Sequence, residues 1–103
     1  MKFSVNILFL FASLAVADLH NTGVCINSGG KGVNVYNRDA TEKACTAYKN
    51  RNTGSKQWDT CPDCTIKNDQ SILYYCDTAA QHMGGDEWNY YCKQNGAEES
   101  LAW

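Results

Sequence analysis

From residue 24 onward, apolar and polar residues alternate in short runs, which predict a mixture of strands and helices. Val24–Ile26 begins a strand. Val33 and Val35 alternate with a polar residue, as in a short, half-buried strand. The glycine cluster at 28–32 predicts a tight turn between these strands, because glycine adopts the positive φ values that such turns need. The polar residues 18–23 have no such pattern, and we expect them to be frayed.

A first helix is predicted over residues 39–51, because apolar residues recur there at helical spacing. Asp39 is the expected N-cap, and Glu42 is expected to reach back to it in a capping box. Gly54 is the expected stop. The predicted buried face of this helix consists of Ala40, Ala44, Cys45 and Tyr48.

The next segments predict a hairpin, preceded by a loop over residues 55–63. Cys64–Lys67 and Ser71–Cys76 are rich in residues that favour strands, and the polar residues 68–70 between them form a turn. A hairpin is consistent with both runs, because a short polar turn joins two antiparallel strands. Residues 64–76 are therefore expected to pair with each other.

A second helix is predicted to open at Gly84–Asp86 and to end at Asn95–Gly96. Trp88, Tyr91 and Cys92 occupy positions i, i+3 and i+4 and should share its buried face. A final short strand is expected over residues 100–103.

The predicted fold is α+β, with the element order β-α-β-β-α-β. This is the split βαβ order of a ferredoxin-like two-layer sandwich. Each helix carries one cysteine on its apolar face, Cys45 and Cys92, so disulfides are expected to tie both helices to the sheet. An irregular, knottin-like fold with the same cysteines is the alternative.

The first 17 residues have the features of a secretory signal peptide. Lys2 gives a positive start, Ile7–Leu14 is apolar, and Ala15–Ala17 is a small-x-small cleavage motif. The apolar run is shorter than the roughly 20 residues that cross a bilayer. We therefore expect cleavage of residues 1–17, leaving a single secreted, extracellular domain over residues 18–103 that is monomeric and not membrane-bound.

Six cysteines in a short exported chain predict a disulfide framework. A domain this small buries only about 60–65% of its unfolded surface, so cross-links would supply stability that its core lacks. Sequence alone leaves the pairing open. The predicted disulfide residues are Cys25, Cys45, Cys61, Cys64, Cys76 and Cys92.

The Cys61-Pro62-Asp63-Cys64 motif could indicate a redox site, because such pairs can lower a thiol pKa. Redox pairs of this kind normally precede a helix, whereas here a strand is expected to follow. The favoured interpretation is two structural disulfides to two different partners.

Metal binding and catalysis find little support in the sequence. Several cysteines and one histidine could together bind zinc. The secretory pathway oxidises thiols to disulfides, which leaves no thiolate for a metal, so no metal and no cofactor are predicted. The residues of that zinc alternative are Cys61, Cys64, Cys76, His82 and Cys92. A hydrolase or nuclease could combine His82, Glu87 and Arg38, but their spacing does not demand it, and no catalytic residue is predicted.

Charge excludes two classes of partner, and the aromatic residues favour a third. Without its signal peptide the chain has eight basic and eleven acidic residues, a net charge of −3, and no basic cluster. Binding to nucleic acid or to an anionic membrane is therefore not expected. Tyr75 and Tyr90 are the candidate exposed aromatics, one on a strand and one off the buried helix face, and they suit contact with a protein or glycan.

Three stretches carry a resemblance to a known family: Cys45-x-x-Tyr48, Trp58 to Cys64, and Gly84 to Cys92. With the signal peptide and six cysteines, they resemble the biotrophy-associated secreted proteins of plant-associated filamentous fungi. The element order is also similar to that of killer-toxin-like α/β effectors. The resemblance implies an effector, exported to the host interface, that binds a host molecule or alters immunity. Because no catalytic constellation is present and tyrosines are plentiful, we expect it to bind a host protein or glycan without enzymatic activity. The alternatives are an antimicrobial or killer-type toxin and a small secreted nuclease or hydrolase.

Overall fold

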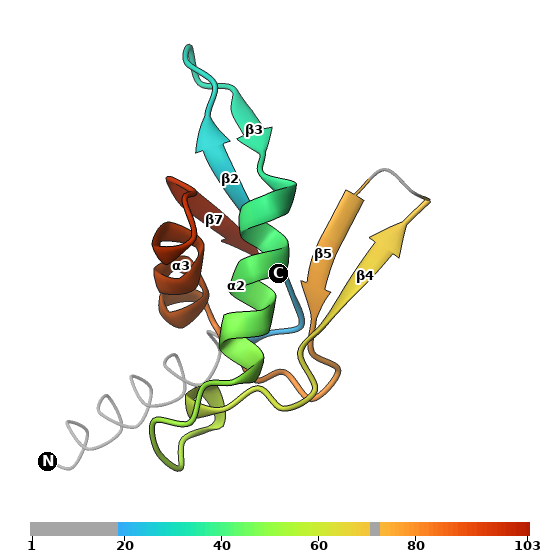
Figure 1. Ribbon diagram of the computed structural model, residues 1–103, viewed down its shortest axis with the longest axis vertical. Helices are drawn as coiled ribbons and strands as arrows, with labels where there is room; N and C mark the ends of the chain where they lie inside the picture. Colours follow the sequence, from blue (N-terminus) through green and yellow to red (C-terminus); the bar gives the residue numbers. More distant parts are fainter. Residues whose placement is uncertain (1–18, 71–72) are drawn as a thin grey trace, which may run out of the picture.

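Two helices pack against antiparallel strands in the computed structural model, which describes residues 19–70 and 73–103 (Figure 1). The predicted signal peptide, residues 1–17, lies outside the described residues, as do residues 71–72 of the predicted hairpin. In chain order the elements are β1 (Leu19–His20), β2 (Thr22–Ser28), β3 (Asn34–Tyr36), α2 (Arg38–Lys49), the 3₁₀ turn η1 (Gln57–Asp59), β4 (Thr65–Asp69), β5 (Leu73–Asp77), β6 (Met83–Gly84), α3 (Gly85–Gln94) and β7 (Glu99–Ala102).

The strand β2 is the centre of the larger sheet. It pairs antiparallel with β3, β5 and β7, and β5 pairs in turn with β4. The strands β1 and β6 form a separate two-stranded sheet. Both helices pack on β2 and contact each other; α2 also covers β4 and β5, and α3 covers β7.

The predicted α+β class is confirmed, with two helices, antiparallel sheets and three disulfides. The narrower prediction of a ferredoxin-like, split βαβ order is not confirmed. The short strands β1 and β6 were not predicted, and the β1–β6 sheet lies apart from the larger one.

Residues 19–23 are not frayed as predicted. Leu19 pairs with Gly84 and His20 with Met83, and β2 already begins at Thr22. A strand of two residues is too short to produce a hydrophobic period, so its pairing is not visible in the sequence.

The first helix begins at a different cap from the predicted one. Asn37 is the N-cap: its Oδ1 accepts a hydrogen bond of 2.9 Å from the N–H of Ala40. Asp39 lies within the first turn, and Asp39 and Glu42 form i,i+4 ion pairs with Lys43 and Arg38. Asn and Asp are about equally good caps, and the bond from the N–H of Asn37 to the carbonyl of Cys25 fixes Asn37 just outside the helix.

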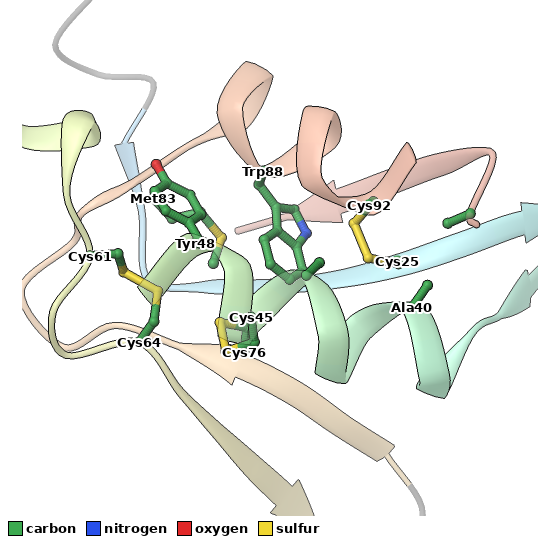
Figure 2. Close-up of a cluster of buried hydrophobic side chains, with 12 residues drawn as sticks. Cys25, Ala40, Cys45, Tyr48, Cys61, Cys64, Cys76, Met83, Trp88 and Cys92 are labelled. Carbon is green, nitrogen blue, oxygen red and sulfur yellow. A yellow bond between two sulfur atoms is a disulfide. The ribbon is translucent and has the colours of Figure 1, made fainter. Parts of the chain in front are cut away.

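Two disulfides tie the helices to the larger sheet, as predicted for Cys45 and Cys92. Cys25–Cys92 joins β2 to α3, and Cys45–Cys76 joins α2 to β5 (Figure 2). The loops that they close span 67 and 31 residues of sequence, so both restrict the unfolded chain strongly.

The third disulfide corrects a prediction, because Cys61 and Cys64 are bonded to each other rather than to two different partners. A tight turn brings them together: the N–H of Cys64 donates to the carbonyl of Cys61 at 3.0 Å. The two Cα atoms are 5.3 Å apart, within the range that a disulfide spans.

The core lies between the two helices and β2. Trp88, Tyr48 and Met83 are fully buried there, next to the disulfides (Figure 2). The indole N–H of Trp88 donates to the carbonyl of Val24 at 3.1 Å, so its one polar group is satisfied. A Cβ at Gly23 would lie 2.6 Å from Met83 Sδ and from Trp88 Nε1, so this strand position has room only for glycine.

Candidate functional site

A cavity of about 390 Å³ opens where β1, η1 and the first turn of α3 meet. This volume is within the range of small-molecule sites. One wall is aromatic, and the others combine an imidazole with two carboxylates. The lining residues are Leu19, His20, Trp58, Gly84, Gly85, Asp86 and Glu87.

The aromatic wall, Trp58, is carried by η1, which is anchored through Asp59. The Asp59 carboxylate accepts hydrogen bonds from the Thr53 hydroxyl at 2.6 Å and from the Lys56 N–H at 2.9 Å. These two bonds, with the nearby Arg51 guanidinium at 3.6 Å, lower the pKa of Asp59. Asp59 is therefore ionised at neutral pH and holds the turn that presents Trp58.

The other side of η1 is held against residues 80–82. The Gln57 side-chain amide donates to the carbonyls of Ala80 at 3.0 Å and Gln81 at 2.7 Å. The Gln57 carbonyl lies 2.8 Å from His82 Nδ1. With its backbone fixed on both sides, the Trp58 wall is positioned before any ligand arrives.

Tyr48 joins this aromatic wall to the start of α3. Its hydroxyl accepts a hydrogen bond of 3.1 Å from the N–H of Gly84 and lies 3.1 Å from the carbonyl oxygens of Trp58 and His82. Burial raises the pKa of Tyr48 to about 12. The phenol therefore stays neutral at physiological pH and can donate to a carbonyl while it accepts from Gly84.

The floor of the cavity depends on Gly84, which is the N-cap of α3. The Glu87 carboxylate packs directly over Gly84, and a Cβ there would also lie 3.2 Å from the Cβ of Trp58. Glu87 and Asp86 occupy the first turn, where the helix dipole favours negative charge. The half-buried Glu87 and the exposed Asp86 both line the cavity.

His20 is a lining residue that sequence reasoning missed, because it was assigned to a frayed segment. The pairing of β1 with β6 brings it to the cavity, with its Nε2 3.6 Å from where a Cβ of Gly85 would lie. No sequence signal pointed to it, since a two-residue strand shows no periodicity.

One of the two candidate aromatics shares a helix face with a residue that lines this cavity. Tyr90 is 53% exposed and follows Asp86 by one helical turn, so both share a face of α3. Its ring contacts the Tyr91 ring edge-on, with the centroids 5.1 Å apart. Tyr75 is half-buried in β5, where it pairs with Lys67 of β4, and the β4–β5 hairpin packs on α2 rather than on the cavity. Their role in binding stays a prediction.

The residues considered for a nuclease or hydrolase have separate partners. Glu87 lines the cavity, and His82 contacts the Gln57 carbonyl. Arg38 pairs with Glu42 at 2.8 Å and covers the Tyr74 ring, 3.6 Å from its centroid. The structure therefore does not assemble these three side chains into one acid–base site.

The cysteines considered for a metal site are all bonded in pairs among the described residues. The Sγ atoms of Cys45, Cys64 and Cys76 lie within 4.8 Å of one another. As disulfide sulfurs they present no thiolate, which is the form that binds a metal. Within residues 19–70 and 73–103, no helix has the length and apolar character needed to span a bilayer.

Three disulfides in so small a fold are typical of a secreted domain, because the oxidising environment outside the cell keeps them formed. A family model described as biotrophy-associated secreted protein 4 matches residues 18–100. The chain belongs to this family of secreted effectors, and it is a secreted, extracellular protein. No curated protein and no solved structure matches it.

Proposed function

We propose that this effector acts without catalysis by binding a host glycan in the cavity between Trp58 and the first turn of α3. The observation that carries the proposal is a tryptophan, held by a fixed loop, in a cavity that two carboxylates also line. A saccharide presents an apolar C–H face and a rim of hydroxyl donors, and the cavity offers a partner for each. The Trp58 ring would pack against the C–H face, and Glu87 and Asp86 would accept from the hydroxyls.

Preorganisation favours binding at this position. Asp59, Gln57 and Tyr48 fix the backbone around Trp58 through hydrogen bonds to three other segments. A wall that is already ordered loses little conformational entropy when a ligand binds. Tyr90 would extend the contact along α3 for an oligosaccharide longer than the cavity.

The carboxylate arrangement supports binding rather than glycoside hydrolysis. Glycosidases place two carboxyl groups on opposite sides of the scissile bond. Asp86 and Glu87 are consecutive residues in the first turn of α3, so both carboxylates come from a single wall of the cavity. His82, the other candidate acid, contacts a backbone carbonyl of η1.

The test is a binding titration of residues 18–103 against soluble plant cell-wall oligosaccharides, with Trp58→Ala as the site variant. We expect the affinity to fall at least about tenfold in Trp58→Ala, the equivalent of roughly 1.4 kcal/mol. Tyr75→Ala tests the other candidate aromatic, which lies on the β4–β5 hairpin away from the cavity; the cavity proposal predicts that this variant binds normally.

Equal affinity of the wild type and Trp58→Ala would exclude the cavity as the binding site. Absence of any glycan binding, together with capture of a host protein that Trp58→Ala fails to capture, would keep the cavity but replace the glycan with a protein partner. Degradation of the oligosaccharide by the wild type would contradict the non-enzymatic mode.

A further inference from the structure

Two of the three disulfides lie against each other beside the C-terminal half of α2. The Sγ atoms of Cys45, Cys64 and Cys76 are all within 4.8 Å of one another. Cys64 is bonded to Cys61, whereas Cys45 and Cys76 are bonded to each other (Figure 2). One sulfur of the short disulfide is therefore close to both sulfurs of the long one.

A cavity of about 230 Å³ opens beside this sulfur cluster. All four cysteines are buried, but Cys45 and Cys64, each 2% exposed, line the cavity, whereas Cys61 and Cys76 do not. Lys49 lines the same cavity and follows Cys45 by one helical turn of α2. A lysine ammonium attracts a thiolate and stabilises it, so the opening favours attack by an external thiol. The other lining residues are Thr46, Thr65 and Ile66.

We propose that Cys61–Cys64 and Cys45–Cys76 form a thiol–disulfide exchange site that opens with a low-molecular-weight thiol. The two disulfides differ in what they contribute to the fold. Cys61–Cys64 spans a sequence separation of 3, whereas Cys45–Cys76 spans 31. Because the gain from loop closure grows with loop length, the short disulfide contributes least to stability, and opening it disturbs the fold least.

The exchange needs no reactant other than the external thiol and the protein disulfide. A thiolate RS⁻ attacks Cys64 Sγ, which forms a mixed disulfide and releases Cys61 as a thiolate that takes a proton from water. A second RS⁻ attacks the R sulfur of the mixed disulfide, which forms RSSR and releases the Cys64 thiolate. Two external thiols are thereby oxidised to one disulfide, and one protein disulfide is reduced.

The Cys64 thiolate then lies within reach of the second disulfide. Attack on Cys45 or Cys76 forms a new bond to Cys64 and releases the other cysteine as a thiolate. This step consumes no oxidant, because it exchanges one S–S bond for another. Its consequence is structural: the link between α2 and β5 is replaced by a link to the segment that precedes β4.

The exchange is tested by incubating residues 18–103 in graded glutathione buffers, trapping thiols with acid and an alkylating agent, and mapping the disulfides by mass spectrometry. We expect a bond from Cys64 to Cys45 or Cys76 under conditions in which Cys25–Cys92 is still intact. Loss of all three disulfides together would overturn the proposal, as would free Cys61 and Cys64 beside an unchanged Cys45–Cys76.

A matched pair of variants isolates the step within the protein. Cys61→Ser leaves the Cys64 thiol inside the sulfur cluster, and a fraction of the protein should carry the rearranged bond without any added thiol. Cys64→Ser leaves the Cys61 thiol instead, which is not part of the cluster, and it should keep Cys45–Cys76. Identical disulfide maps around Cys45 in the two variants would contradict the proposal, and the graded reduction of the wild type decides the question if either variant fails to fold.

The rate at which glutathione opens Cys61–Cys64 gives an independent test, because it should depend on Lys49. Lys49→Gln should slow the opening of Cys61–Cys64 by glutathione roughly threefold or more, because the thiolate loses its nearby cation. Lys43→Gln is the control: Lys43 is an exposed lysine of the same helix that pairs with Asp39 instead. An equal rate in both variants would remove Lys49 from the site.

Discussion

The Tyr48 hydroxyl accepts a hydrogen bond of 3.1 Å from the backbone N–H of Gly84, 36 residues further along the chain. The same hydroxyl lies 3.1 Å from the carbonyl of Trp58. One buried phenol thus joins the helix α2, the loop that carries the aromatic wall, and the N-cap of α3. The shape of the cavity depends on this contact.

Replacing Tyr48 with Phe should lower the free energy of unfolding by about 1–3 kcal/mol, because the buried N–H of Gly84 loses its acceptor. Guanidinium unfolding followed by tryptophan fluorescence measures the change. Tyr90→Phe removes a hydroxyl from an exposed side chain and should stay within about 0.5 kcal/mol of the wild type. Equal stabilities of the two variants would show that the Tyr48 hydroxyl does not join these segments.

The same residue predicts a loss of stability at alkaline pH. The pKa of Tyr48 rises from 10.0 to about 12 on folding, chiefly through burial. Its stabilising contribution is therefore complete below pH 10 and is lost as the pH rises toward 12, because the unfolded chain ionises first. Burial also raises the pKa of Tyr36, so the wild type should be compared with Tyr48→Phe. In the variant, the free energy of unfolding should fall less steeply between pH 10 and 12; parallel curves would contradict the assignment.

Asp63 predicts a loss of stability at acidic pH. Burial opposes its ionisation, but hydrogen bonds from the Thr78 hydroxyl at 2.7 Å and the Ala80 N–H at 3.0 Å outweigh burial and lower its pKa below 3.8. Its contribution is therefore present above pH 3.8 and is lost as the pH falls through the lowered value. Asp63→Asn should be less stable than the wild type at pH 6, and the difference should shrink on acidification. A stability difference that stays constant down to pH 2 would show that the Asp63 carboxylate does not cause the loss of stability in acid.

Gly23→Ala should destabilise the protein by about 1–3 kcal/mol, because the added Cβ meets Met83 and Trp88 at 2.6 Å in a filled core. The control is Gly85→Ala, where the nearest atom is His20 Nε2 at 3.6 Å, an ordinary contact. In the first turn of α3 this change should be neutral or stabilising by up to about 1 kcal/mol. Thermal unfolding of both variants measures the contrast, and a stable Gly23→Ala would show that the core can rearrange around this strand.

The contributions of the long and the short disulfide to the stability of the protein should differ by about twofold. Removing Cys25–Cys92 by paired alanine substitution should cost on the order of 4 kcal/mol, and removing Cys61–Cys64 on the order of 2 kcal/mol, because loop-closure entropy grows with loop length. Guanidinium unfolding of both double variants tests the order. A larger loss from the short disulfide would indicate that it shapes the native fold rather than restricting the unfolded chain.

Sequence patterns predicted the elements in which apolar residues recur at regular spacing over several turns. The apolar face of α2, with Cys45 and Tyr48, and the Trp88 and Cys92 positions of α3 are all buried as expected. Helical periodicity is a local signal, and it also placed two cysteines on the sides of the helices that meet the sheet.

Features that depend on contacts between distant segments could not be predicted in this way. The choice of Asn37 over Asp39 as the cap depends on a bond to β2. The pairing of Cys61 with Cys64 depends on a local turn instead, but it was missed because the cysteine spacing alone leaves every pairing open. His20 reaches the cavity only because β1 pairs with residues more than sixty positions away. The wall and the floor of the candidate site are therefore products of the tertiary fold.

The most direct test of the proposed function is to map a bound glycan on the protein. Isotope-labelled residues 18–103 would be titrated with plant cell-wall oligosaccharides, and the amide and indole N–H resonances followed by NMR. The proposal predicts shifts concentrated at the Trp58 indole and the backbone of Gly84–Glu87. Shifts confined to the β4–β5 hairpin, or no shifts with any oligosaccharide, would contradict it.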